Sequence, residues 1–484
     1  MANASGSGRS GISADIKEFV KSVYIIKAPS YGNSFFYSLG FLLLTCFAVL
    51  VVTGIIMVFF GPFWWDTNPA GVFIRSIHLW AAQAMTVILV LHLLTIVSTS
   101  AYRKKKLIWM LGAVMFFLVL LQVAFGVVVR GDFVSQWNAL SAADLWNGMY
   151  LGYWINPINW GAVYGWHIAI VPIVLLVLMG THYLMVRSKG ISKPYRNDIP
   201  YRMVEIDHRK MYMRAIMLVA LILAFAFLFR AQYVAPMTIQ RATVMNSSAV
   251  AVTLLNEFNY SSGTATYMDS IDPYHYSTRQ VYVTVPYDKY LQITNGTNYE
   301  AQFLEEPRSV QTIQLADAFS YFSANSTYNT TANATNPLIP MVSSLLKMAR
   351  SGTYDSVING EAGSYLDTTY QLRFLSDTGE MYALAAKDKL LPQDWGIVKG
   401  GTSWWPPGVW LGGAYNWLEV YVLGNDPNQD RDGGFIAEIA LILFIAFPFI
   451  PYANELPDKL KMYKIVWNRF TIPELRRKKK RNRR

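Results

Sequence analysis

Six stretches of this 484-residue chain are long and apolar enough to cross a lipid bilayer. A hydrocarbon core of about 30 Å takes roughly 20 residues of helix, and it offers no water to satisfy free backbone groups. The stretches lie near 37–60, 74–99, 107–129, 163–186, 212–233 and 433–453. The 53% hydrophobic content agrees with this pattern. The sequence therefore predicts an all-α transmembrane bundle of about six spans.

The net charge of +11 follows from where the basic residues fall along the chain. "YRKKK" (102–106), eight Lys or Arg between Arg187 and Arg214, and the final "RRKKKRNRR" all lie on one side of the membrane if the N-terminus is inside. Cytoplasmic loops carry such an excess of Lys and Arg. We therefore expect a multi-pass protein of the cell membrane, with both termini cytoplasmic, in contact with lipid and without a nucleic-acid partner.

The long segment 234–432 falls on the opposite side of the membrane in this topology. Six of the seven N-x-S/T sequons of the chain lie in it, which predicts glycosylation there. They are Asn246, Asn259, Asn295, Asn325, Asn329 and Asn333. Within the segment, "RQVYVTVPYDKYLQIT" (279–294) alternates as a strand would. We therefore expect a mixed, β-containing extracellular domain inserted between the last two spans.

These signals divide the chain into five parts. We expect a cytoplasmic N-terminus with an interfacial helix near 15–27, a five-span bundle, an extracellular glycosylated insertion, a sixth span and a basic cytoplasmic tail. Their ranges are 1–36, 37–233, 234–432, 433–453 and 454–484. The one cysteine, Cys46, rules out an intramolecular disulfide and a CxxCH haem attachment.

Four of the six histidines lie inside predicted spans. His78 and His92 are fourteen residues apart, which places them on one helix face and about 21 Å apart along the axis. His167 and His182 are fifteen apart on another span that runs in the same direction. The spacing therefore predicts two level pairs, His78 with His167 near the outer surface and His92 with His182 near the inner one.

Ionisable residues at membrane depth are rare and indicate function. Facing imidazoles at two levels favour bis-histidine ligation of two stacked haems over simple packing of polar side chains. A polar pathway through a transporter or channel is the alternative. Two further spans carry glycine pairs fourteen apart, where a bulky group could approach the backbone. These glycines are Gly40, Gly54, Gly112 and Gly126.

With these features the sequence resembles the cytochrome b/b6 family of quinol-oxidising complexes. The resemblance covers roughly 15–233, and more weakly 410–455. It includes the histidine spacings, the paired glycines, "TCFAVLVVTG" in the first span, "IRSIH" opening the second, and "WHIAIVPIVLLVLMGTHYLMVRSKGISKP" in the fourth. The fifteen-residue spacing is similar to the b6 branch.

The resemblance implies that His78 and His167 ligate an outer haem, and that His92 and His182 ligate an inner one. Arg75 would pair with a propionate of the outer haem. Quinol would be oxidised near the outer face. One electron would pass to a Rieske iron–sulfur protein and the other across both haems to an inner quinone site.

The chain departs from the family pattern at several positions. Ser38 stands where the b6 type has a cysteine for an extra covalent haem, so no such haem is expected. The family's Pro-Glu-Trp-Tyr motif is replaced in register by "YNWL" (415–418), and "WWPPGVW" (404–410) is a rival position. A quinol site needs a proton acceptor. The candidate quinol-site residues are Trp417, Asn416, Glu419 and Asp132.

Large sequon-rich outer loops are similar to those of archaeal cytochromes b. Some of these sit beside a Rieske protein in a terminal-oxidase assembly and carry A-type haems. The haems here are therefore b-type or A-type, and the partners could extend to terminal-oxidase subunits and a copper or haem electron carrier. Three functions remain open: a quinol-oxidising electron-transfer subunit, a haem-bearing wire or scaffold without its own quinol site, and a transporter or channel.

Overall fold

The computed structural model describes residues 27–191, 199–267, 275–324, 335–399, 410–424, 426, 429–468, 471, 472 and 474. Several predictions fall on the other residues. These are nearly all of the interfacial helix near 15–27, all but the last residue of "WWPPGVW", the basic C-terminal run, and the sequons at Asn325, Asn329 and Asn333.

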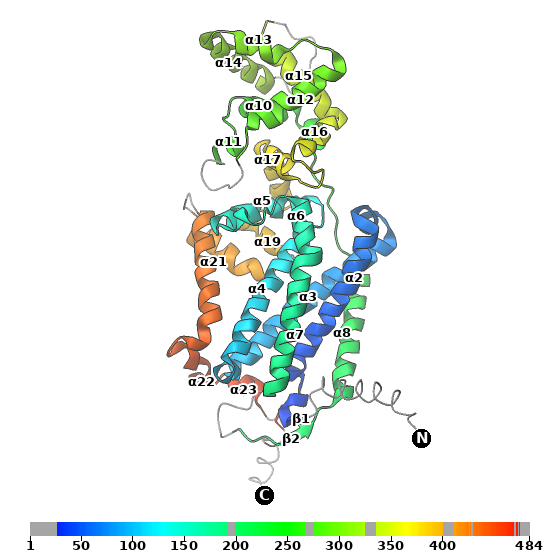
Figure 1. The fold of residues 1–484 in the computed structure, drawn as a ribbon, viewed down its shortest axis with the longest axis vertical. Coiled ribbons are helices and arrows are strands. Elements are labelled where there is room, and N and C mark those ends of the chain that lie inside the picture. Colours follow the sequence, from blue (N-terminus) through cyan, green and yellow to red (C-terminus); the bar gives the residue numbers. More distant parts are fainter. Residues whose placement is uncertain are drawn as a thin grey trace, which may run out of the picture. The chain divides into compact units, whose positions relative to one another are not determined.

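Six helices in the described part are long and apolar enough to span a membrane, which confirms the predicted number (Figure 1). They are α2 (Leu39–Thr67), α3 (Pro69–Ser98), α4 (Lys106–Val128), the run Trp160–Lys189 that contains α6 (Trp160–Gly165), η5 (Trp166–Ile170) and α7 (Val171–Lys189), α8 (His208–Leu228), and the run Arg431–Phe449 within α21 (Gln429–Ala446) and η10 (Phe447–Phe449). Many of their apolar side chains face outward, as lipid contact requires; Phe63, for example, is 83% exposed.

The chain divides into two compact units, which we describe separately. Unit 1 comprises residues 1–119, 172–231 and 441–484, and unit 2 comprises residues 120–171 and 232–440.

In unit 1, α2 and α3 form a tight helical hairpin on which α8 packs. Asn68 alone separates the first two helices, and its side chain accepts a hydrogen bond from the Ala70 amide at the start of α3. Gly71 permits this close approach, because a Cβ there would lie 2.3 Å from the carbonyl oxygen of Trp64. The hairpin therefore sets α2 and α3 antiparallel along their length.

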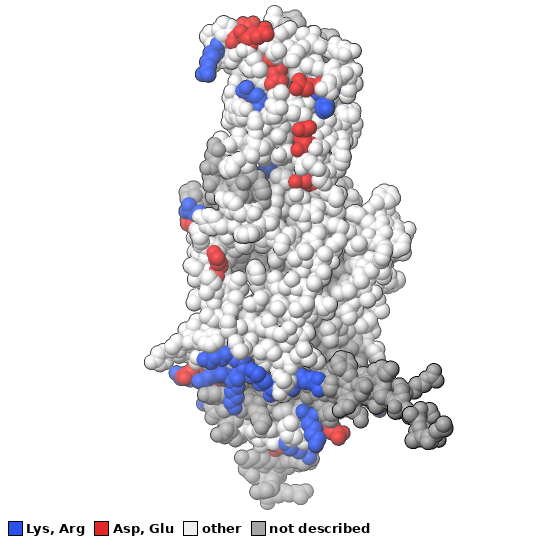
Figure 2. All heavy atoms as spheres, in the orientation of Figure 1, with Lys and Arg blue, Asp and Glu red and all other residues white. Residues whose placement is uncertain are grey.

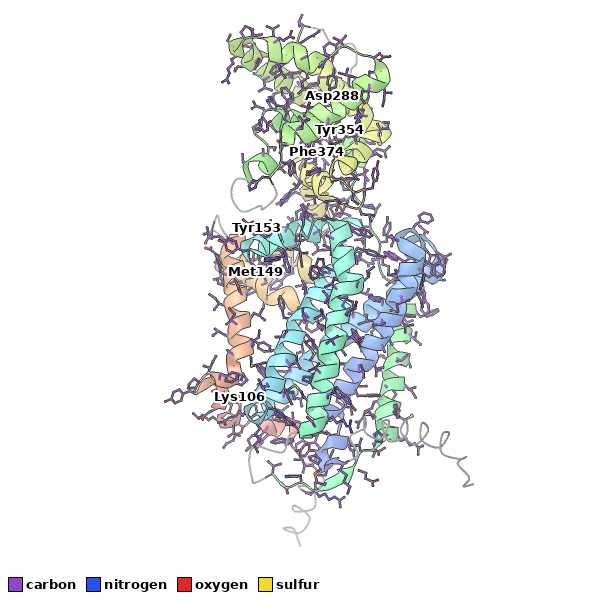
Figure 3. The ribbon with its side chains drawn as sticks, viewed as in Figure 1. Lys106, Met149, Tyr153, Asp288, Tyr354 and Phe374 are labelled. Atoms are coloured by element: carbon purple, nitrogen blue, oxygen red, sulfur yellow. The ribbon has the colours of Figure 1, made fainter. Side chains whose placement is uncertain are left out.

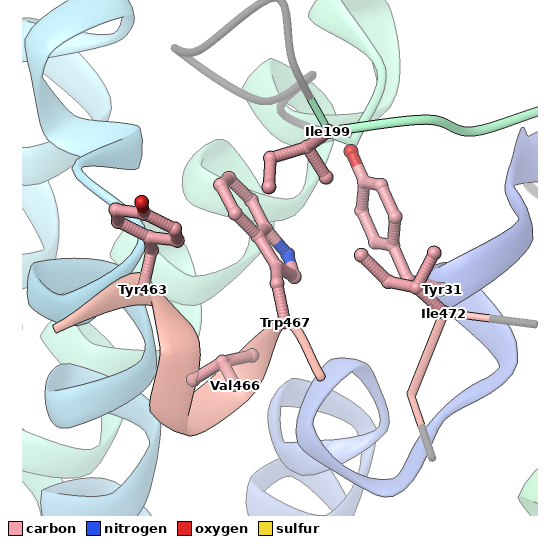
Figure 4. Close-up of a cluster of buried hydrophobic side chains, with 6 residues drawn as sticks. All are labelled: Tyr31, Ile199, Tyr463, Val466, Trp467 and Ile472. Carbon is pink, nitrogen blue, oxygen red and sulfur yellow. The ribbon is translucent and has the colours of Figure 1, made fainter. Parts of the chain in front are cut away.

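A small cluster closes one end of unit 1 (Figure 4). Its buried side chains are Tyr31, Ile199, Tyr463, Val466, Trp467 and Ile472. The Trp467 indole donates a hydrogen bond to the Tyr37 hydroxyl, at 3.0 Å. Nearby, β1 (Lys27–Pro29) pairs antiparallel with β2 (Met203–Glu205), and α22 (Leu456–Lys459) and α23 (Tyr463–Val466) pack on α3. Segments far apart in the sequence therefore meet beside the spans.

In unit 2, the described residues between spans five and six form helices joined by loops and no strand, so the expected mixed, β-containing domain is not confirmed there. The helices are α9 (Ile239–Met245), α10 (Ser247–Phe258), α11 (Gly263–Tyr267), η6 (Gln280–Thr284), α12 (Val285–Thr294), α13 (Tyr299–Glu305), α14 (Arg308–Ala324), α15 (Leu338–Ser351), α16 (Thr353–Glu361), α17 (Thr369–Asp377), α18 (Glu380–Lys387), η7 (Pro392–Asp394), α19 (Gly396–Lys399), η8 (Trp410–Gly412), α20 (Gly413–Trp417) and η9 (Leu418–Val422).

The segment 279–294, expected as a strand, forms η6 and α12. Its buried residues include Tyr282 with Pro286 and Val283 with Tyr287, each pair four apart, as on a helix face. Pro286 is the second residue of α12 and directly follows the π-helical turn η6. Figure 3 labels Tyr354 and Phe374 of the same core, whose ring centroids lie 5.8 Å apart.

Hydrogen bonds join this helical domain to the start of α6 within unit 2. The Asn159 side-chain amide donates to Asp367 at 2.8 Å, and the Gly161 amide donates to the carbonyl of Leu366 at 2.8 Å. α5 (Phe133–Gly148) packs on α17 and bonds through the Trp137 indole to the carbonyl of Leu390. The domain is therefore anchored on the segment that leads into His167.

Candidate functional site

Each of the four histidines predicted as ligands lies beside one of the four predicted glycines on a neighbouring helix. The pairs, with the distance from the ideal Cβ position of the glycine to the imidazole Cε1, are Gly40 and His92 (3.9 Å), Gly54 and His78 (3.5 Å), Gly112 and His182 (3.6 Å), and Gly126 and His167 (3.0 Å). In each pair of helices, the glycine with the higher number lies beside the histidine with the lower number. The two helices are therefore antiparallel, and the glycine spacing on one matches the histidine spacing on the other.

Unit 1 holds three of the histidines. His92 and His182 approach closely enough for their imidazoles to interact electrostatically, which brings together the predicted inner pair. The Nδ1 atom of His182 is buried without a hydrogen-bond partner. His78 lies against α2, where its Nδ1 is 2.9 Å from the hydroxyl of Thr53.

Unit 2 holds His167, in a π-helical turn, η5. The Val171 amide bonds to the carbonyl of Trp166 across this turn, and Pro172 has no amide hydrogen to offer the next carbonyl, that of His167. The side-chain amide of Gln122, on α4, donates to that carbonyl instead, at 2.8 Å. The turn is therefore held from a neighbouring helix at the position of a predicted ligand.

The arrangement fits haem better than a metal held by protein side chains alone. Among the described residues, no group of three or more His, Cys, Asp or Glu could hold a metal ion. Two imidazoles complete the coordination of an iron whose other four ligands are porphyrin nitrogens. The glycines leave each imidazole edge without a side chain between it and the neighbouring backbone.

Arg75, expected at a haem propionate, is buried and forms an ion pair with Asp66 near the end of α2. A guanidinium has five N–H donors, so this pairing does not exhaust it. Ser38 accepts a hydrogen bond from Arg214 and donates one to the carbonyl of Ser34.

The four candidate quinol-site residues all lie in unit 2 and differ in their surroundings. Asp132 is fully buried, caps α5 through the Ser135 amide and pairs with Arg130. Asn416 is buried and donates to the carbonyl of Pro392, at 2.8 Å. Trp417, on α20, is 53% exposed. Glu419, in the π-helical turn η9, is half-buried.

Two residues beside the histidines escaped the sequence analysis, although both carried a signal. Gln122 is an uncharged polar residue in an otherwise apolar span, where such residues commonly bond between helices. Thr53 directly precedes Gly54, one of the glycines expected to face the site. Their hydrogen bonds to His167 and His78 support the two histidines predicted for the outer haem.

Comparison with known proteins bears on the same region. A family model described as cytochrome b (N-terminal)/b6/petB matches residues 83–242, which include His92, His167 and His182. The chain is 28% identical to cytochrome b6 of Heliomicrobium gestii over 202 residues, which are 37% of this chain and 95% of that protein. It is 29% identical to cytochrome b6 of Heliobacterium modesticaldum over 204 residues, again 37% of this chain and 95% of the relative.

A solved structure titled "Hyperthermophilic respiratory Complex III" covers 77% of this chain and 98% of its own, at 16% identity and a TM-score of 0.39, a level of likeness that supports no argument about fold. The sequence matches carry more weight, since the b6 relatives are matched over 95% of their length and the family model covers three of the four histidines. Residues 83–242 of this chain therefore match the N-terminal, b6-type part of the cytochrome b family.

Proposed function

We propose that this chain is the di-haem electron-transfer subunit of a respiratory complex that oxidises quinol. The observation that carries the proposal is the pairing of all four span histidines with glycines on neighbouring helices. A polar pathway for a transported solute has no need of a glycine opposite every histidine. A flat macrocycle between helices needs both an axial imidazole and close backbone.

In this proposal His92 and His182 ligate the inner haem, and His78 and His167 ligate the outer one. The haems, when bound, carry single electrons across the membrane. The residues of the chain supply the axial nitrogens and apolar surroundings. Arg75, which pairs with Asp66, would also bind an outer propionate, where a charge-assisted hydrogen bond is strong.

For the quinol site we propose Glu419 as the proton acceptor, in preference to Asp132. The Asp132 carboxylate already accepts a hydrogen bond from the Ser135 amide of α5 and pairs with Arg130. Glu419 follows Trp417 by two residues in the segment that takes the place of the family motif. Trp417 has the exposure to meet a quinol ring.

One observation favours the second candidate, a haem-bearing wire without its own quinol site. The amide of Asn416, which stands where the family has a glutamate, is tied to the carbonyl of Pro392 and so serves the fold. Electrons would then enter from a partner subunit. We expect a Rieske-type protein as the immediate partner, with terminal-oxidase subunits and a copper or haem carrier as further candidates.

For the orientation we propose cytoplasmic termini and an extracellular helical domain. Figure 2 shows Lys and Arg gathered at one end of unit 1, beyond the largely uncharged sides of the spans. Arg103 and Lys106 lie at the connection between α3 and α4, and their charge agrees with the positive-inside rule. The described sequons, Asn246, Asn259 and Asn295, are exposed, as glycosylation requires.

The test is a pyridine haemochrome spectrum of the purified full-length chain. We expect about two haems per chain, and the spectrum will also distinguish b-type from A-type haem. His78→Ala should remove the outer haem selectively, and His182→Ala the inner one. A chain without haem would instead favour the transporter or channel.

A second measurement separates the two haem-bearing candidates. Quinol added to the oxidised complex should reduce the haems, and an outer-site quinol inhibitor should block this reduction. Glu419→Gln should slow the reduction, whereas Glu361→Gln, an exposed glutamate on α16, should not. Haems that quinol cannot reduce would favour the wire.

A further inference from the structure

The hydroxyl of Thr53 lies between its own helix and the ring of His78. Its Oγ1 is 2.7 Å from the carbonyl oxygen of Val49, 3.2 Å from that of Leu50, and 2.9 Å from the Nδ1 of His78. Thr53 is 5% exposed, so no solvent competes for these bonds. The three contacts together constrain where the hydrogens are.

A threonine hydroxyl has a single proton to donate, and carbonyl oxygens can only accept. If that proton went to His78, the oxygen of Thr53 would face the Val49 carbonyl at 2.7 Å with no hydrogen between them. The proton therefore goes to the carbonyl, and the hydroxyl accepts from the His78 ring. His78 is then protonated on Nδ1, and Nε2 keeps its lone pair.

Other threonines in these spans show that this donation is their ordinary behaviour. Each bonds through its hydroxyl to the carbonyl four residues earlier, at 2.8 to 3.0 Å, as threonines in helices commonly do. They are Thr45, Thr86, Thr95 and Thr181. Thr53 makes the same bond to its own helix. It differs because its hydroxyl oxygen also accepts a hydrogen bond from His78 on the next helix.

We propose that Thr53 is a positioning residue, which selects the Nδ1-protonated tautomer of His78 and so presents Nε2 as the iron ligand. The inference rests on the proposed haem function. Gly54 limits the ring on the same side, because the position of a Cβ there is 3.5 Å from Cε1. Thr53 therefore selects the tautomer of the His78 ring, and the next residue, Gly54, limits where the ring lies.

The hydrogen bond also affects the electronic character of the ligand. An imidazole that donates its Nδ1 proton is a more basic ligand, and it stabilises the oxidised iron. The Nδ1 of His182 is buried without a partner, so this ligand of the inner pair lacks that effect. Loss of the Thr53 hydroxyl should therefore change one haem and leave the other.

The experiment is a redox titration of the purified haem-loaded protein, monitored by absorbance and fitted to two one-electron components. Thr53→Val removes the hydroxyl at nearly constant shape. Thr53→Ser keeps it. Thr86→Val is the matched control, since Thr86 is a buried threonine of α3 with the same bond to its own helix.

We expect Thr53→Val to raise the ratio of reduced to oxidised outer haem about tenfold at a fixed potential, because hydrogen bonds that support a metal ligand change metal affinity about 10- to 100-fold. That is a shift of about 59 mV in one component. The other component should not move. Thr53→Ser should restore the wild-type value, and Thr86→Val should match the wild type.

Two failures are distinguishable in this experiment. A wild-type chain without two haems overturns the proposed function itself. Two haems with a Thr53→Val titration equal to the wild type, or shifted as much as that of Thr86→Val, overturn the role of Thr53 alone.

Discussion

Substitution of Gly126 by alanine should weaken one haem selectively. The new methyl group would lie 3.0 Å from the Cε1 of His167 and 3.7 Å from both ring nitrogens. Carbon atoms in favourable contact are about 3.5–4.0 Å apart, so the ring must move by roughly half an ångström or more. The Gln122 bond to the His167 carbonyl opposes a backbone shift, so the ring has to rotate.

The cost follows from ordinary packing energies. Overpacking a buried site costs about 1–3 kcal/mol, and a side chain about 30° from its rotamer costs about 0.5–1.5 kcal/mol. If the haem-bound state bears this cost, haem affinity at His167 falls by about 5- to 150-fold. Alanine stabilises a helix by up to about 1 kcal/mol relative to glycine, so the temperature of thermal unfolding should not fall.

Gly180→Ala is the matched control, because Gly180 lies in α7 and nothing lies within 4 Å of the position of a Cβ there. The assay is haem transfer from each purified variant to excess apomyoglobin, followed by absorbance. Gly126→Ala should lose one haem faster than the wild type, and Gly180→Ala should retain both. Equal retention by the two variants, or equal loss, would refute the argument from these distances.

Three further predictions concern other parts of the chain. Burial, reinforced by Asp377, raises the pKa of Glu257 to about 8. The folded state then binds the extra proton between about pH 4.5 and 8, so stability should fall as pH rises through that window. In denaturant titrations between those pH values, Glu257→Gln should reduce the change of the unfolding free energy with pH by a few kcal/mol. A change with pH equal to that of the wild type would contradict the prediction. Gln122→Met should lower the unfolding free energy by about 1–3 kcal/mol, because it removes the side-chain amide that donates to the His167 carbonyl. Calorimetry would show an unchanged unfolding transition if that bond contributes nothing. Asn295→Gln should remove one glycan, seen as a mass loss in the protein from its native membrane, because Asn295 is exposed at the end of α12; an unchanged mass would show that the site is unused.

The six spans and the histidine and glycine repeats could be predicted because both follow from local rules. A bilayer demands a run of apolar residues of helical length, and helical geometry turns a spacing of fourteen into a shared face. The spacing also predicted the two level histidine pairs, and the resemblance implied that each pair ligates a haem, which stays a prediction. His92 and His182 do approach one another, as the spacing predicts.

The strand predicted for segment 279–294 was wrong, because its pattern of apolar residues suits both a strand and a helix. The alternation of residues at 279–294 fits a strand. Tyr282 and Pro286 also share one face of a helix, and packing in the surrounding helical core favours the helix. The roles of Asp132 and Asn416 were also beyond reach. Their partners, Arg130 and the Pro392 carbonyl, become evident only when the chain has folded.

The sequence by itself determined which residues enter the membrane and which faces of each helix carry imidazole or glycine, because those properties depend on neighbours within one helix. Only the tertiary structure decided which glycine meets which histidine and where each ring nitrogen finds its partner. Thr53 and His78 are twenty-five residues apart, and Gln122 and His167 forty-five. Such contacts depend on the register between helices, which side-chain packing selects and no single span contains.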